Sequence, residues 1–339
     1  MALVTIAGGA FHPLWLRDNC PCPECRHGSG QRLLDTRSLP DDLEVVAVDG
    51  TNVTFSDGHT STFDPALLAA TPAPRPRRLW GAEIQDDLPV SRYSEVAAGG
   101  AALRDWLRAV DQLGFAILTG CPTDPGTVTR VAELFGFVRE TNYGRLFDVK
   151  TVVDPTNLAY TGLGLGAHTD NPYRDPTPTL QLLHCLASSA DGGENTLVDG
   201  FRVVQDLTRD DLELLARSPI RFRYADADAE LETETPVISL DPRGETEAVH
   251  YNTRSAQPFA LPDGLVGPYY GAYQRFGRML EAPEYRIQFK LAPGDLFIVD
   301  NLRVLHGRTA YAATGGERRL QGCYADRDGL RSRLAVLSR

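Results

Sequence analysis

Beyond about residue 135, brief apolar runs alternate with short segments rich in glycine, proline and aspartate. Clear examples are LQLLHCL, NTLVDG, RIQFKL, GDLFIVDN and RLQGCYA. Short strands separated by turns are typical of an all-β barrel or a double-sheet jelly roll. One helical pattern, near 264–281, interrupts this series. The sequence therefore predicts a mainly β catalytic core, a double-stranded β-helix with flanking helices.

The first 72 residues have a different texture. Segments 43–48 and 52–55 are strand-like and are joined by a turn, and the proline- and arginine-rich segment 71–80 reads as a linker. We therefore expect two domains, 1–75 and 76–339. Early in the second domain, helical spacing predicts a helix over 91–113. A buried strand is expected at 114–118 and a shorter helix at 127–135.

His168 and Asp170 lie two residues apart, so on an extended segment both side chains point to one face. His306 follows the apolar run GDLFIVDN, from which the chain could return across a barrel. Two imidazoles and a carboxylate form the facial set of ligands used by non-haem iron(II) oxygenases, which leaves open positions on the metal. An isolated H-x-D tripeptide is weak evidence, because a local turn pair explains it equally well.

Arg318 and Arg319 follow His306 and strengthen the iron hypothesis. A buried guanidinium there could bind the distal carboxylate of 2-oxoglutarate as a fork, whereas the other arginine is expected to be solvated. The remaining histidines that we considered lack such support and are expected to be structural or exposed: His12, His27, His184 and His250.

Three cysteines, Cys20, Cys22 and Cys25, crowd into one tight turn. Neighbours this close do not readily form disulfides with one another, and a fourth ligand would complete a closed, structural zinc site. His59 is the best candidate by position and His27, nearer in sequence, competes with it. The other cysteines are expected in the core: Cys121, Cys185 and Cys323.

The formal net charge of −11 argues against a general nucleic-acid binder, because phosphates would be repelled, and weakly favours a small cationic substrate. No apolar run reaches the length of a membrane span, and the N-terminus lacks the basic region of a secretory signal. We therefore expect a cytoplasmic protein without a membrane partner.

The stretch LWLRDNCPCPEC with His59 downstream resembles the N-terminal domain of the γ-butyrobetaine hydroxylase and trimethyllysine hydroxylase family. The stretches NLAYT, AHTDNPY, QLLHCL, LVDGF, PGDLFIVDNLRVLHGR and GCYADRD resemble its catalytic domain, which belongs to the taurine-dioxygenase-like 2-oxoglutarate oxygenases. The resemblance covers nearly the whole chain in the right order. It implies a small N-terminal zinc-binding domain of α+β or β type before the jelly roll.

The resemblance implies roles for individual residues. His168, Asp170 and His306 match the iron ligands, and His59 completes the zinc set in preference to His27. The six-residue spacing to Tyr324 selects Arg318 as the 2-oxoglutarate arginine, and Leu183 matches a backbone position lining the co-substrate pocket. The matching trimethylammonium cage consists of Tyr143, Phe147, Tyr160 and Tyr324, and the matching carboxylate-binding residues are Asn157 and Asn252.

Two substrate positions depart from the family pattern. Phe147 stands where the family often has tryptophan, the strongest cation–π partner, and Asn171 stands where the animal enzyme has tyrosine. The expected reaction is hydroxylation of an unactivated carbon of a small quaternary ammonium compound, γ-butyrobetaine to L-carnitine, as in carnitine biosynthesis. The family also suggests Fe(II), 2-oxoglutarate, O2, structural Zn(II), ascorbate as activator and a homodimer.

Two other readings of function stay open. The first keeps the same chemistry on another small amine, amino acid or trimethylammonio-phosphonate. The second is a non-enzymatic zinc-binding scaffold, against which the intact set of His168, Asp170, His306 and Arg318 speaks, because a scaffold does not need it.

Overall fold

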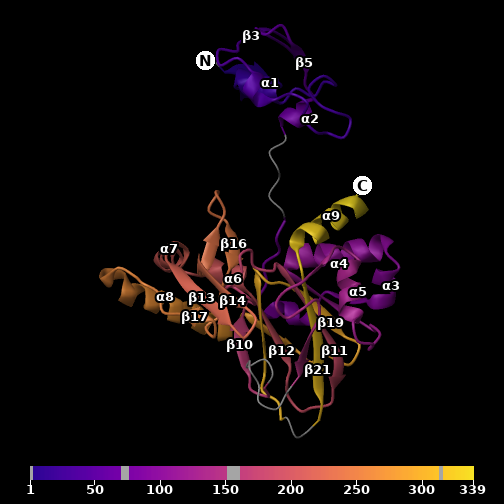
Figure 1. Ribbon diagram of the computed structural model, residues 1–339, viewed down its shortest axis with the longest axis vertical. Helices are drawn as coiled ribbons and strands as arrows, with labels where there is room; N and C mark the ends of the chain where they lie inside the picture. Colours follow the sequence, from indigo (N-terminus) through magenta and orange to yellow (C-terminus); the bar gives the residue numbers. More distant parts are fainter. Residues whose placement is uncertain (1–2, 70–75, 151–160, 313–315) are drawn as a thin grey trace. The chain divides into compact units, whose positions relative to one another are not determined.

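The structure is a computed structural model that describes residues 3–69, 76–150, 161–312 and 316–339 (Figure 1). The chain divides into two compact units, Met1–Arg75 and Pro76–Arg339. Each unit has its own core, and the two are described separately below. No helix in the described ranges is long and apolar enough to cross a membrane.

The N-terminal unit is small. Its elements are β1 (Val4–Ile6), β2 (Gly9–Phe11), α1 (Pro13–Asp18), the 3-10 turn η1 (Thr36–Ser38), β3 (Val45–Asp49), β4 (Asn52–Phe55), β5 (Thr60–Thr62) and α2 (Pro65–Leu68). Strands β3, β4 and β5 form one antiparallel sheet, and β1 pairs with β2. The fully buried core is limited to Ile6, Leu16, Leu43, Val53, Phe55 and Phe63. A core of this size supplies little folding free energy, so a bound metal ion could add to the stability of the unit.

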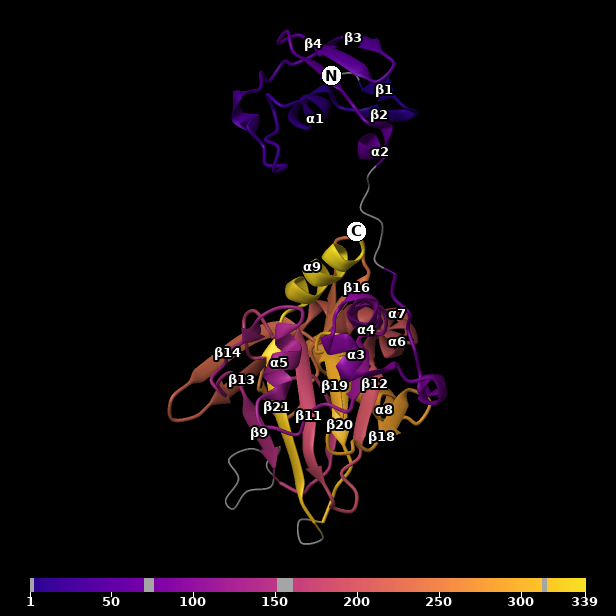
Figure 2. The same cartoon turned by 90° about the vertical axis from the view of Figure 1, so that its right-hand side faces the viewer.

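The second unit is built on two sheets (Figure 2). The major sheet has the order β6 (Val90–Arg92), β7 (Phe115–Thr119), β19 (Leu296–Asp300), β11 (Leu180–Ser188), β21 (Arg318–Ala325) and β8 (Val138–Arg139), and β9 (Phe147–Lys150) also pairs with β21. The minor sheet has the order β10 (Leu165–His168), β20 (Val304–Arg308), β12 (Asn195–Asp199) and β18 (Arg286–Phe289). All pairings in these sheets are antiparallel except that of β6 with β7.

The inner faces of the two sheets share one core. Leu183 of β11 and Phe297 of β19 belong to the same buried cluster as Leu197 of β12, Ile287 of β18 and Val304 of β20. Alternate residues of a strand point to opposite faces, so Leu180 and Leu182 of β11 pack on the outside instead. The side chains at odd-numbered positions of β11 therefore face the space between the sheets.

Helices cover the outer faces of both sheets. On the major sheet, the helices are α4 (Gly100–Leu113), α5 (Thr127–Glu133) and α9 (Arg327–Leu337), with α3 (Tyr93–Ala97) beside α4. On the minor sheet, the helices are α6 (Gly200–Gln205), α7 (Arg209–Arg217) and α8 (Asp263–Glu281). The remaining elements are η2 (Ala82–Asp86), the β13 (Pro219–Ala225), β14 (Glu230–Pro236) and β17 (Ala256–Gln257) sheet, and the pair β15 (Ile238–Leu240) and β16 (Thr246–Val249).

The mainly β prediction with flanking helices is confirmed, and the apolar runs quoted above coincide with β11, β12, β18, β19 and β21. Two expectations were wrong. The helix expected over 91–113 is a strand followed by two helices, broken near Gly99, where φ is +86°. The reading of 71–80 as linker fails at Trp80, which is buried and donates from Nε1 to the Leu113 carbonyl at 2.7 Å.

Candidate metal centres and active-site cavity

His168 and His306 are direct cross-strand neighbours. His168 closes β10, and His306 lies opposite it on β20, with ring centroids 4.4 Å apart. The preceding residues, Ala167 and Leu305, point outward into the core under α6 and α8. Strand alternation therefore turns both imidazoles inward, between the two sheets.

Asp170 lies two residues beyond the end of β10 and is held in place by Asn301. The Asp170 amide donates to Asn301 Oδ1 at 2.7 Å, and Asn301 Nδ2 donates to the Asp170 carbonyl at 2.9 Å. Asn301 Nδ2 also donates to the Pro178 carbonyl at 2.8 Å. One fully buried amide thus fixes the backbone of the turn that carries the carboxylate.

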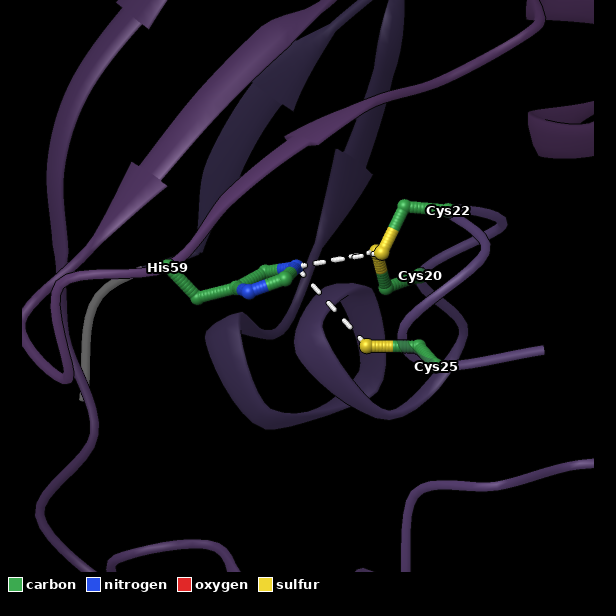
Figure 3. Close-up of side chains that lie close together, drawn as sticks. All are labelled: Cys20, Cys22, Cys25 and His59. Carbon is green, nitrogen blue, oxygen red and sulfur yellow. Dashed lines mark hydrogen bonds between the residues drawn. The ribbon is translucent and has the colours of Figure 1, made fainter.

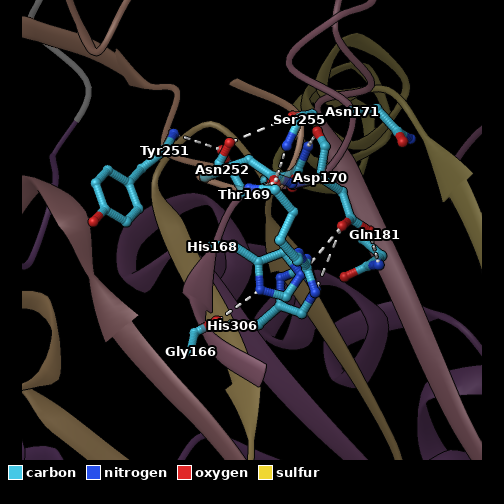
Figure 4. Close-up of polar contacts among 12 residues, drawn as sticks. Gly166, His168, Thr169, Asp170, Asn171, Gln181, Tyr251, Asn252, Ser255 and His306 are labelled. Atoms are coloured by element: carbon cyan, nitrogen blue, oxygen red, sulfur yellow. Dashed lines mark hydrogen bonds and ion pairs between the residues drawn. The ribbon is translucent and has the colours of Figure 1, made fainter. Parts of the chain in front are cut away.

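The three side chains converge on one point (Figure 4). Asp170 Oδ1 lies 3.4 Å from His168 Nε2 and 3.9 Å from His306 Nε2. His168 Nδ1 lies 2.9 Å from the Gly166 carbonyl, which places the ring proton there and leaves Nε2 with a lone pair for a cation. Two imidazoles and a carboxylate in this arrangement fit a facially coordinated iron(II) ion.

The second oxygen of the carboxylate is already engaged. Asp170 Oδ2 accepts hydrogen bonds from Gln181 Nε2 and, at 2.8 Å, from the Tyr324 hydroxyl. Burial would raise the pKa of Asp170, but the two imidazoles and the Tyr324 hydroxyl hold it below its usual range. Burial lowers the pKa of His306 to about 3. A charged carboxylate and a neutral imidazole are the forms that bind a metal.

The three ligands adjoin a cavity of about 510 Å³. Arg318 lines it as a buried side chain, with Nε donating to the Gly193 carbonyl and Nη2 to Asn195 Oδ1, each at 3.1 Å. Its Nη1 is buried and has no hydrogen-bond partner among the described residues. The guanidinium is therefore fixed in place with donors still available for an anion. The neighbouring Arg319 pairs with Asp148 at 3.3 Å and is absent from the cavity lining.

Aromatic rings form part of the cavity wall. Among the predicted cage residues, Phe147 lies 6.2 Å from Tyr143 and 5.2 Å from Tyr324, measured between ring centroids. Two tyrosines that the sequence analysis missed join them: Tyr224 lies 5.6 Å from Tyr143 and 5.2 Å from Tyr173. The predicted substrate residues Asn157 and Tyr160 lie outside the described residues. Leu183 lines the same cavity.

Asn171 cannot contribute an aromatic ring to the cavity wall, and its side chain instead accepts a hydrogen bond from Tyr173. Its backbone has φ of +55°, and its Oδ1 accepts a hydrogen bond from the Tyr173 hydroxyl at 2.6 Å. Tyr173 in turn shares a 2.9 Å hydrogen bond with the Tyr143 hydroxyl. Asn171 thus orients the tyrosine that follows two residues later, a link that the H-T-D-N sequence did not reveal.

Gln181 was also missed, although the sequence held a signal for it. It is a polar residue inside the apolar run LQLLHCL and is buried in the structure. Gln181 lies opposite Tyr324 in the pairing of β11 with β21, so the two donors reach Asp170 together. A buried glutamine in a strand of this kind needs a polar partner, and that partner is the Asp170 carboxylate.

The N-terminal unit brings the cysteine cluster and His59 together (Figure 3). His59 Nε2 lies 3.2, 3.6 and 3.7 Å from the Sγ atoms of Cys20, Cys22 and Cys25. Zn–S bonds of about 2.3 Å and a Zn–N bond of about 2.0 Å at a tetrahedral angle place sulfur and nitrogen roughly 3.5 Å apart. The four side chains therefore fit a tetrahedral zinc ion.

Arg17 links the cysteine cluster to Asp57. Its Nη1 donates to Cys25 Sγ at 3.2 Å, and its Nε pairs with Asp57 at 2.7 Å. Asp57 Oδ1 accepts a hydrogen bond from the backbone N–H of His59 at 3.0 Å. Arg17 and Asp57 thus link Cys25 to His59, which are two of the four candidate zinc ligands. Burial raises the pKa of the Cys25 thiol to about 11, and a bound cation would keep it as a thiolate at neutral pH. His27 instead contacts Ser29.

Two family models match the chain. The taurine catabolism dioxygenase TauD, TfdA family matches residues 70–324, and the γ-butyrobetaine hydroxylase-like N-terminal family matches residues 7–68. γ-Butyrobetaine dioxygenase of Pseudomonas sp. strain AK-1 is 38% identical over 97% of this chain and 91% of its own length. Human mitochondrial trimethyllysine dioxygenase is 30% identical over 96% of this chain and 82% of its own length.

Solved structures resemble the fold at lower identity. Asparagine oxygenase superposes with a TM-score of 0.55 at 20% identity, covering 68% of this chain and 80% of its own. The non-haem iron oxygenase OrfP, solved with Fe and α-ketoglutaric acid, has a TM-score of 0.54 at 17% identity and covers 74% of this chain and 87% of its own.

Proposed function

Because this chain belongs to the TauD, TfdA family of dioxygenases and is an iron- and 2-oxoglutarate-dependent oxygenase, we propose that it hydroxylates a small quaternary ammonium compound, γ-butyrobetaine, to give L-carnitine. The observation that carries this proposal is the junction of His168, Asp170 and His306 with an aromatic-walled cavity. The 38% identity to a γ-butyrobetaine dioxygenase supports the choice of substrate.

The iron ligands in this proposal are His168, Asp170 and His306. When bound, the ferrous ion supplies the activation of O2 that is coupled to decarboxylation of 2-oxoglutarate. The protein fixes which carboxylate oxygen serves as ligand, because Gln181 and Tyr324 occupy Oδ2 and leave Oδ1 facing the two imidazoles.

Arg318 holds the distal carboxylate of 2-oxoglutarate. Its buried Nη1 is available, and the Gly193 carbonyl and Asn195 keep the guanidinium from rotating. A Cβ at Gly193 would lie 2.8 Å from Arg318 Cδ, so glycine is needed for this close approach. Leu183 supplies an apolar wall beside the co-substrate.

Tyr143, Phe147 and Tyr324 receive the cationic head of the substrate. A quaternary ammonium has no N–H to donate, and each π face contributes roughly 0.5–2 kcal/mol of attraction. The rings of Tyr173 and Tyr224 adjoin this group and replace part of the aromatic surface that Asn171 does not provide. The proposed cage also contains Tyr160, and Asn157 and Asn252 are proposed to face the other end of the substrate.

The test is a panel of γ-butyrobetaine, trimethyllysine and a trimethylammonio-phosphonate, each incubated with the protein, iron(II), 2-oxoglutarate and ascorbate. We expect γ-butyrobetaine to gain one oxygen by mass spectrometry, with an equal amount of succinate formed. Turnover of either other compound in the absence of any gain on γ-butyrobetaine would reject the proposed substrate but keep the oxygenase.

We further propose that domain 1–75 holds a structural zinc ion on Cys20, Cys22, Cys25 and His59, separate from the catalytic domain 76–339. The distances within the cluster support this assignment. A homodimer that is activated by ascorbate is proposed from the family resemblance. A cytoplasmic location without nucleic-acid or membrane partners is proposed from the net charge, the apolar runs and the N-terminus. Light scattering, and turnover with and without ascorbate, check the first two of these points.

A further inference from the structure

Arg254 lines the active-site cavity without an ionic partner. It lies on the turn that follows β16, and its side chain contributes to the cavity wall. Among residues 3–69, 76–150, 161–312 and 316–339, no carboxylate forms an ion pair with its guanidinium and no hydrogen bond reaches it. The carboxylate of Asp170 acts on it electrostatically, but that carboxylate is committed to the metal, Gln181 and Tyr324.

Arg254 is an exposed residue whose side chain lines the cavity, so its guanidinium is accessible to a ligand that enters there. Partial desolvation lowers its pKa, and the nearby Asp170 carboxylate raises it. A ligand carboxylate entering the cavity would provide the missing partner and accept two parallel hydrogen bonds from the guanidinium.

The turn that carries Arg254 is tied to the iron ligands through Asn252 (Figure 4). Asn252 Oδ1 accepts from the backbone N–H groups of Arg254 and Ser255 at 3.2 and 3.3 Å. Its Nδ2 donates to the carbonyl of Thr169, between His168 and Asp170, at 3.0 Å. Two further hydrogen bonds join Thr169 to Tyr251. These hydrogen bonds fix the backbone of the turn that carries Arg254 relative to the residues of the proposed iron site.

A second donor faces the same cavity. Asn171 is 4% exposed and lines the cavity, and its Nδ2 is buried without a hydrogen-bond partner among the described residues. Its Oδ1 is held by Tyr173, so rotating the amide would not satisfy both ends. An unsatisfied buried N–H of this kind costs about 1–3 kcal/mol, and a ligand oxygen would relieve that cost.

We propose that Arg254, fixed by Asn252 and assisted by the amide of Asn171, binds the carboxylate of the substrate, so that the site selects zwitterions over cations of the same shape. This inference rests on the proposed function and deepens it, because it adds a cationic group for the substrate carboxylate to the cavity that holds the aromatic cage. Asn252 then acts mainly as a positioning residue for Arg254.

2-Oxoglutarate is the competing anion, and the surroundings of the two arginines separate the roles. The Ser255 carbonyl, next to Arg254 in the chain, accepts a hydrogen bond from the backbone N–H of Arg223 at 2.9 Å, so this turn lies beside Tyr224 of the aromatic wall. Arg318 instead donates to the Gly193 carbonyl and to Asn195. We therefore assign Arg254 to the substrate and Arg318 to the co-substrate.

The experiment compares γ-butyrobetaine with its neutral carboxamide, which has the same shape. We expect the wild-type enzyme to favour the carboxylate in kcat/KM by roughly 10–100-fold, the range for hydrogen bonds to a charged group. Arg254→Gln should lower kcat/KM for γ-butyrobetaine by this factor and change kcat/KM for the carboxamide by less than about twofold. Arg254→Lys should recover part of the kcat/KM for γ-butyrobetaine. The KM for 2-oxoglutarate should change less than about twofold.

The matched control is Arg223→Gln. Arg223 also lines the cavity but is already paired with Glu230 at 2.8 Å, so its loss should leave the carboxylate preference intact. Equal losses on both compounds in Arg254→Gln, or a rise confined to the KM for 2-oxoglutarate, would overturn the inference. Thermal melts of each variant identify a folding defect.

Calorimetric binding to the iron(II)–2-oxoglutarate complex without oxygen gives a readout that does not need turnover. The Arg254→Gln change should weaken binding of the carboxylate and leave that of the carboxamide unchanged. If the wild-type enzyme oxidises only trimethyllysine, the proposed function fails, and the same comparison is made with trimethyllysine and its carboxamide. A carboxylate preference that survives in Arg254→Gln, on whichever substrate binds, rejects the subsite.

Discussion

The two units each gather histidine and anionic side chains around one point, but they do so in opposite ways. In the N-terminal unit, three of the four ligands come from the single turn Cys20–Cys25, and four ligands close the coordination shell. In the second unit, the three ligands come from β10, the turn after it and β20, and a cavity of about 510 Å³ opens beside them.

The proposed assignment gives the two metals different roles, one in folding and one in the reaction. Because the core of the N-terminal unit is small, we expect zinc binding to supply a share of its folding free energy. In the second unit, the three side chains are carried by two sheets that have a core between them and further cores on their outer faces. We therefore expect that the fold of this unit does not depend on a metal. Removing each metal should therefore have opposite effects on stability and on activity.

The largest expected effect is that of His168→Ala on turnover. Losing one of three iron ligands should reduce succinate formation to the metal-free background, while the melting temperature of the second unit changes little because the side chain lies at a cavity. His27→Ala, at an exposed histidine outside both clusters, is the control. Turnover of His168→Ala well above that background would contradict the assignment of iron.

Chelation of zinc should give the next largest effect, this time on folding. Binding free energies of about 10 kcal/mol or more are typical of structural zinc, and the N-terminal unit should lose most of its amide protection against hydrogen exchange. Peptides from 76–339 should keep theirs. Unchanged exchange in 1–75 after the metal has been removed, verified by elemental analysis, would show that zinc is not structural.

Arg318→Lys should raise the KM for 2-oxoglutarate roughly 10–100-fold, because an ammonium cannot replace two parallel hydrogen bonds to a carboxylate. The adjacent Arg319→Lys is a matched control, since Arg319 pairs with Asp148 and lies off the cavity. Steady-state kinetics with varied 2-oxoglutarate distinguish the two. Equal effects of both substitutions would mean that Arg318 acts only through strand β21.

Arg17→Gln should have the smallest effect and sharpens the comparison within the zinc site. The variant loses the hydrogen bond to Cys25 and the ion pair with Asp57, and zinc affinity should fall by roughly 10-fold. Competition with a chromophoric chelator measures this. Arg37→Gln, at an exposed arginine outside the cluster, should leave the affinity unchanged.

The sequence predicted best what local spacing and strand alternation determine. The Cys20–Cys25 turn, the pair His168 and Asp170, and the apolar strands of both sheets all follow from short-range pattern. The choice of Arg318 over Arg319 needed the family resemblance. In the structure, alternate residues of β21 point inward, so that Arg318 lines the cavity and Arg319 does not.

The rest depended on contacts between distant segments. Tyr224 of β13 contacts Tyr143 on the turn before β9, and Asn301 binds the backbone of Asp170 from another loop. Arg254 lines the cavity on a turn that Asn252 fixes. Trp80 was misread for a related reason, because its proline- and arginine-rich neighbours look solvated while its own ring is buried. No local pattern marks such partners, because the topology of the two sheets brings them together.

The direct pairing of His168 with His306 has a consequence for how the enzyme is loaded. Both imidazoles are set by the pairing of β10 with β20, and Asn301 holds the backbone of Asp170, so contacts within the protein position all three side chains. We therefore expect iron to leave and return at the rate of ligand exchange, with no refolding step. A chain that has lost its iron should regain full turnover within the mixing time of added Fe(II), whereas zinc, once removed, should return only as fast as its domain folds.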